Sequence, residues 1–67
     1  MANGEWSIAG RDLDGRKRPV SVVVWGERVV VASAGEYAVL SPLEVGRLRA
    51  ALRDAALTAA GEEPPRA

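Results

Sequence analysis

The chain has 67 residues, with nine basic and nine acidic side chains, and it contains no histidine, cysteine or phenylalanine. A chain this short forms at most one domain and buries only about 60% of the surface that its unfolded form exposes. It can form no disulfide and no zinc site of nitrogen and sulfur ligands, and its balanced charge argues against a surface that is basic throughout.

The first 40 residues have the composition of β-strands. Short apolar runs rich in valine, separated by glycine, aspartate and asparagine, predict strands at 5–9, 20–25, 28–33 and 37–40. Gly26-Glu27 joins the second and third strands, and a pair with glycine first suits a type II′ hairpin turn. Because sequential strands usually pair, the pattern predicts a four-stranded antiparallel meander.

Ser41 begins a helix whose start carries three signals. The Ser41 hydroxyl can cap an early amide, Pro42 suits the first helical position, and Glu44 completes a capping box. Apolar residues then recur on one stripe: Val45, Leu48, Leu52, Ala55, Ala56 and Ala59. The helix is expected to end near Ala60, with Gly61 as its C-cap.

These elements predict an α+β fold of the order ββββα. The amphipathic C-terminal helix is expected to pack on one face of the sheet. One domain is predicted for residues 1–61, and a disordered tail for residues 62–67, which contain two prolines.

The two central strands are apolar on both faces. In the first of them, Val20, Val22 and Val24 project to one side, and Val23 and Trp25 to the other. In the next strand, Val29 and Val31 lie opposite Val30 and Ala32. An antiparallel sheet with one face in water would alternate apolar and polar residues. One helix covers one face, so the other face needs a cover that the rest of the chain does not provide.

The simplest way to cover this second face is a second copy of the chain, packed sheet to sheet about a two-fold axis. A partner protein could cover this face instead. If the sheet curved so strongly that its own edges covered the face, neither a second copy nor a partner would be needed. The predicted interface residues are Val23, Trp25, Val30 and Ala32, with Leu43 and Leu57 on the far side of the helix as secondary candidates.

The sequence offers little catalytic chemistry. Its serines have no histidine to activate them, and Asp12 and Asp14 lie in a polar loop where aspartate usually bonds its own backbone. We therefore expect a protein that is not an enzyme and has no cofactor and no metal. Residues 1–5 lack the regions of a signal peptide, and no apolar run is long enough to span a membrane, so a cytoplasmic location is expected.

Binding of single-stranded nucleic acid is the alternative function. Four cations gather in one loop, namely Arg11, Arg16, Lys17 and Arg18. Trp6, Trp25 and Tyr37 would provide stacking surfaces if they emerged on the same face of the sheet. Acidic residues in the same half of the chain weaken the positive field.

The segment Leu40-Ser41-Pro42-Leu43-Glu44-Val45, followed by Leu48 and Leu52, resembles a group of small actinobacterial proteins of unknown function. These proteins have valine-rich strands and a C-terminal helix capped by Ser-Pro-x-Glu, and some are encoded beside helix-turn-helix regulators. The resemblance covers the C-terminal third of the chain and implies a regulatory accessory role.

Taken with the apolar second face of the sheet, the expected function is non-catalytic binding, through homodimerisation or protein–protein contacts of an exposed apolar sheet face.

Overall fold

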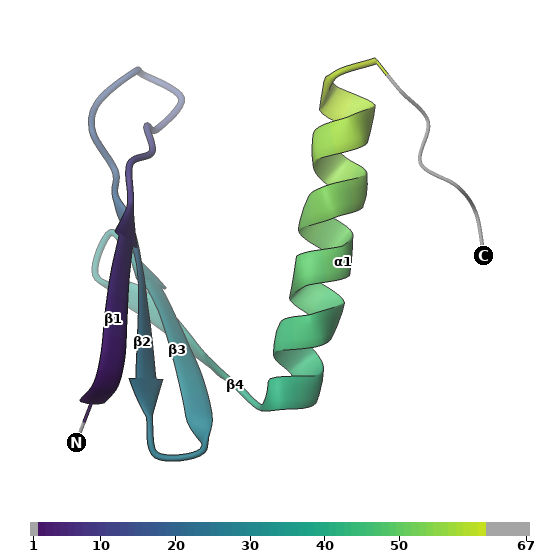
Figure 1. The fold of residues 1–67 in the computed structure, drawn as a ribbon. Coiled ribbons are helices and arrows are strands. Elements are labelled where there is room, and N and C mark those ends of the chain that lie inside the picture. Colours follow the sequence, from purple (N-terminus) through teal and green to yellow (C-terminus); the bar gives the residue numbers. More distant parts are fainter. Residues whose placement is uncertain (1, 62–67) are drawn as a thin grey trace.

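A computed structural model describes residues 2–61 of the chain, and their side chains from residue 4 onwards. It contains the strands β1 (Ala2–Ile8), β2 (Val20–Trp25), β3 (Arg28–Ser33) and β4 (Glu36–Leu40), followed by the helix α1 (Pro42–Ala59). The strands form one antiparallel sheet in the order β1-β2-β3-β4 (Figure 1). The predicted ββββα fold is confirmed. The predicted tail, residues 62–67, lies outside the described residues.

The two central strands have the predicted boundaries, and the outer strands differ by a few residues. β1 begins at Ala2, because its first residues pair with the end of β2 across an irregular register between Ala2 and Gly4. That stretch has no alternating apolar pattern, so pairing with β2 overrides its weak strand propensity. β4 begins at Glu36, which pairs with Ser33.

The two short turns differ in type. A type II′ turn requires positive φ at the first of its two central residues and not at the second. Gly26 has a φ of 62°, and Glu27 is not among the residues with positive φ, so the predicted turn type is confirmed. Ala34 and Gly35 both have positive φ, 54° and 82°. Positive φ at both central residues is the condition for a type I′ turn, so this connection has two residues.

The helix begins as the sequence predicts. The Glu44 amide donates to Ser41 Oγ (3.3 Å), and the Ser41 amide donates to Glu44 Oε1 (2.8 Å), which together form a capping box. At the other end Ala60 is the C-cap, and Gly61 has a φ of 84°, the left-handed conformation that glycine accepts without a steric cost.

The register divides the apolar side chains between two faces. The helix-side face carries Trp6, Ile8, Val20, Val22, Val24, Val29, Val31 and Leu40. The open face, on the other side of the sheet, carries Val23, Trp25, Val30, Ala32, Tyr37 and Val39. The helix approaches β3 and β4, and within residues 2–61 it reaches neither β1 nor β2 (Figure 1).

The molecule has no closed core. Among residues 4–61, no side chain is fully buried. The chain exposes 5832 Å², whereas a compact monomer of this mass exposes about 4,100 Å². Its radius of gyration is 13.8 Å, against about 11 Å for a compact domain of the same length. The strands and the helix are formed, but the valines of β2 and β3 are only partly buried. Larger apolar side chains such as Trp6, Trp25 and Leu52 are more than half exposed.

No helix among the described residues combines the length and the apolar character that crossing a membrane requires.

Candidate functional site

The open face gathers the interface residues that the sequence predicts on the sheet. Val23, Val30 and Val39 form a row across β2, β3 and β4, because Val30 pairs with both of the others. Trp25 flanks this row on one side, and Ala32 on the other. Val23, Trp25, Val30 and Ala32 therefore share one surface, as alternation along the strands predicts.

Two further residues belong to the open face. Tyr37 pairs with Ala32, and Val39 pairs with Val30, which places both on the open face of β4. Tyr37 is 72% exposed and Val39 is 51% exposed, similar to Trp25 at 57%. Alternation within β4, combined with a two-residue turn before it, would have identified them. Aromatic residues are enriched in protein interfaces, so this surface has a suitable composition for one.

The open face becomes polar towards β1. Glu5 and Ser7 of β1 and Ser21 of β2 lie on the same face, next to the apolar row. An apolar centre with a polar rim is the usual anatomy of a protein interface.

The structure does not bring Leu43 and Leu57 to the open face. Both lie on α1, about 120–160° around the helix from Val45. Leu43 is 66% exposed and Leu57 is half-buried. They form a second apolar side of α1, separate from the stripe that is turned towards the sheet.

A groove of about 290 Å³ separates α1 from the helix-side face. Its sheet wall consists of Val22, Val29, Val31 and Leu40, and its helix wall includes Leu48 and Leu52. Leu48 is 36% exposed and Leu52 is 60% exposed, although both belong to the apolar stripe. The helix therefore lies beside its own sheet without closing on it.

The basic loop between β1 and β2 is organised by Asp12. Its carboxylate Oδ1 accepts from the amides of Asp14 (3.0 Å) and Arg16 (2.8 Å), and Oδ2 lies 3.5 Å from Arg18 Nε. The two arms of the loop are joined by the Arg18 amide, which donates to the Gly10 carbonyl (2.8 Å). The prediction that aspartate here bonds its own backbone is confirmed for Asp12.

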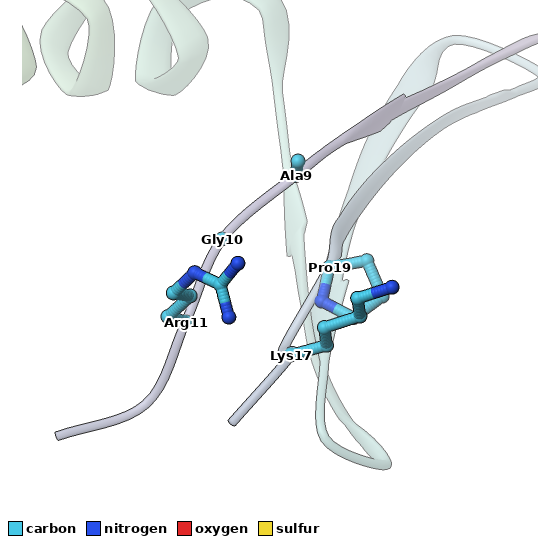
Figure 2. Close-up of a pocket in the computed structure, with 5 residues that line it drawn as sticks. All are labelled: Ala9, Gly10, Arg11, Lys17 and Pro19. Carbon is cyan, nitrogen blue, oxygen red and sulfur yellow. The ribbon is translucent and has the colours of Figure 1, made fainter. Parts of the chain in front are cut away.

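The cations of this loop do not all remain free for a ligand. Arg11 donates to the Gly15 carbonyl (2.9 Å), and Arg18 pairs with Asp12. Figure 2 shows Arg11 on one arm and Lys17 on the other, beside a pocket of about 310 Å³ that Ala9, Gly10 and Pro19 complete. Two cations at an open pocket suit an anion.

The aromatic residues do not form one stacking platform. Trp6 pairs with Val22 on the helix-side face, whereas Trp25 and Tyr37 lie on the open face. The condition that all three emerge on the same face is therefore not met, because alternation along β1 and β2 places Trp6 and Trp25 on opposite faces.

The helix cap perturbs the pKa of one of its own carboxyl groups, that of Glu44. The Ser41 amide, which donates to the Glu44 carboxylate, lowers the pKa of Glu44, and the Ser41 hydroxyl and the charges of Arg28 and Arg47 act in the same direction. This perturbation has a structural cause, since the carboxylate is held at the first turn of α1.

Searches with this sequence and structure found no matching protein-family model, no matching curated protein and no matching solved structure.

Proposed function

We propose that the protein is a non-catalytic binding protein with a regulatory role, and that it acts through its open face. The open face packs against the same face of a second copy, or against an apolar surface of a partner protein. The observation that carries this proposal is the row Val23, Val30 and Val39 with Trp25 and Tyr37 beside it, which no other part of the described chain covers.

The exposed area supports a contact of ordinary size. The chain exposes about 1,700 Å² more than a compact monomer of its mass. A standard protein interface buries about 800 Å² on each partner. One interface of that size on the open face would therefore remove about half of the excess.

The geometry of the sheet favours a second copy as the occupant. Two sheets packed face to face keep their strands within about 30° of each other, and their inner side chains interdigitate. A row of valines flanked by aromatic residues provides such an inner face. A two-fold axis uses the same patch twice, so no further surface is needed.

The test is the mass of the purified chain at micromolar concentration, measured by light scattering. The wild type is expected to be larger than a monomer, and the double variant Trp25→Ser Tyr37→Ser is expected to weaken the open-face contact at least 30-fold, because buried aromatic residues dominate interface energies. Glu5→Gln, at the polar rim, is the control and should leave the mass unchanged.

Charge reversal in the basic loop distinguishes binding through the open face from the alternative function, binding of single-stranded nucleic acid. Arg16→Glu Lys17→Glu is expected to leave the open-face contact intact. If this variant instead abolishes binding of a single-stranded oligonucleotide that the wild type binds at low salt, the loop and not the open face carries the function. A wild-type chain that is a fully folded monomer would contradict the second copy as the occupant of the open face.

A further inference from the structure

The helix-side face of the sheet is only half covered. Each strand takes up about 4.8 Å of the width of a sheet, so four strands span about 19 Å, whereas a helix with its side chains is about 10 Å wide. Among the described residues, α1 approaches β3 and β4 but neither β1 nor β2, and in Figure 1 it stands beside the sheet. On the uncovered half, Trp6 is 57% exposed and Ile8 is 56% exposed. The remaining width is that of one more helix.

The groove beside α1 is open and lined mainly by apolar side chains, with Arg49 as the charged residue on its helix wall. Val22, Val29 and Val31 face Leu48 and Leu52 across it, and its volume is about 290 Å³. Protein interiors are packed as densely as organic crystals and contain few voids larger than a water molecule. Such a space between two apolar walls is therefore expected to be filled in the functional state.

α1 itself is built to contact two apolar surfaces. Its first stripe, Val45, Leu48 and Leu52, faces the groove. Leu43, Ala50 and Leu57 lie on the other side of the helix, at a spacing of seven residues. If the side of α1 that faces away from the sheet were in water, it would carry polar residues. The second stripe therefore indicates that this side also contacts an apolar surface.

We infer that the uncovered half of the helix-side face is occupied by α1 of a second copy. In this two-fold dimer, each α1 lies between its own β3 and β4 and the partner's β1 and β2. The second stripe of α1 then covers the partner's Trp6 and Ile8. The same contact occurs twice, which is the property of a two-fold interface.

The dimensions of the chain fit this arrangement. Its excess surface of about 1,700 Å² per copy accommodates two interfaces of standard size, one on each side of the sheet. The helix-side contact therefore stands independently of the proposed open-face contact.

The experiment starts from the variant Trp25→Ser Tyr37→Ser, in which the open-face contact is disabled and Trp6 is the remaining tryptophan. Light scattering is expected to show a dimer. On dilution, the Trp6 emission should shift to longer wavelength as the dimer dissociates, because Trp6 leaves the contact with α1 and enters water.

Leu43→Glu is then added to this background. Leu43 points away from its own sheet and lies in the first turn of α1, where an acidic side chain favours the helix, so this variant keeps its fold. The helix-side contact should weaken at least 30-fold, since a charge replaces a buried leucine. Ala51→Glu, in the middle of the helix and between the two stripes, is the control and should remain a dimer.

Two results would overturn the inference. One is a monomer in the open-face background with unchanged circular dichroism, and the other is a dimer that Leu43→Glu leaves intact. A different result would contradict the proposed function. If Leu43→Glu alone converts the wild-type chain to a monomer, the open face makes no contact with a second copy.

Discussion

Ala34 occupies a backbone conformation that an alanine adopts at a cost. Its φ is 54°, and with Gly35 it forms the type I′ turn between β3 and β4. The left-handed region places Cβ close to the following carbonyl and costs an L-residue about 1–2 kcal/mol, whereas asparagine is tolerated there because its side chain bonds locally.

We expect Ala34→Asn to raise the free energy of unfolding by about 0.5–1 kcal/mol, since Asn-Gly is a preferred type I′ pair. Urea unfolding monitored by circular dichroism measures this change. Ala34→Val is the control and should lower stability, because a β-branched side chain is the least suited to positive φ. An Asn variant less stable than the wild type would show that the turn has a different conformation in solution.

Glu44 makes the stability of the helix depend on pH. Its pKa is lowered in the folded chain, chiefly by the Ser41 amide, so the folded state favours the charged form. The contribution is complete above the ordinary glutamate pKa of about 4.3, and it is lost as the pH falls through the lower pKa of the folded state.

The expected result is therefore a loss of helix content in acid that the variant Glu44→Gln lacks. Glutamine can still accept from the Ser41 amide but does not titrate, so it is a matched control for the charge. Circular dichroism at the helix wavelength, followed from neutral pH to below pH 4 or so, checks this. If helix content falls with pH in the same way in the wild type and in Glu44→Gln, a group other than Glu44 causes the acid sensitivity.

At the scale of the elements, the β1–β2 loop depends on one carboxylate. Asp12 accepts from two amides and pairs with Arg18. Asp12→Ala should lower the free energy of unfolding by about 1–3 kcal/mol, because two amides lose a charged acceptor. The ion pair with Arg18 adds little, since Arg18 is largely exposed.

Hydrogen exchange locates the effect of Asp12→Ala. The amides of Asp14 and Arg16 should exchange faster in the variant, while those of β3 remain protected. Asp12→Asn keeps an acceptor oxygen and should preserve part of the protection. Equal protection in all three proteins would show that the loop is ordered without this side chain.

Local signals were sufficient to predict most of the fold. The valine runs of β2 and β3, the Gly26-Glu27 turn and the cap at Ser41 all rest on interactions between residues close in sequence, and the structure confirms them. The start of β1 could not be predicted, because residues 2–4 have weak strand propensity and extend only by pairing with β2.

The candidate site was predictable in part for the same reason. Alternation identified the open-face residues of the two central strands. Tyr37 and Val39 were missed because β4 was too short to judge alone. The groove beside α1 was beyond prediction from sequence, since the distance between a helix and a sheet depends on how all the side chains pack.

At the scale of the whole molecule, folding and association should be coupled. Within residues 4–61 no side chain is fully buried, so a single copy gains little from hydrophobic burial. If the proposed contacts between two copies form, the melting temperature should rise with protein concentration, as it does for homodimers whose monomers are weakly folded. Calorimetry over a wide range of concentrations measures this. A melting temperature that does not depend on concentration would show that each copy is stable by itself.

The order of the strands in the sheet has a consequence for the speed of these steps. Each strand pairs with its neighbour in the chain, and three of the four connections between elements are very short. Contacts between residues close in sequence form rapidly, within microseconds for a hairpin. The meeting of two copies is slower, because it depends on diffusion and on orientation. For the proposed association of two copies, this means that a newly made chain forms its strands and helix early, and that the protein concentration then sets how soon its apolar faces are covered.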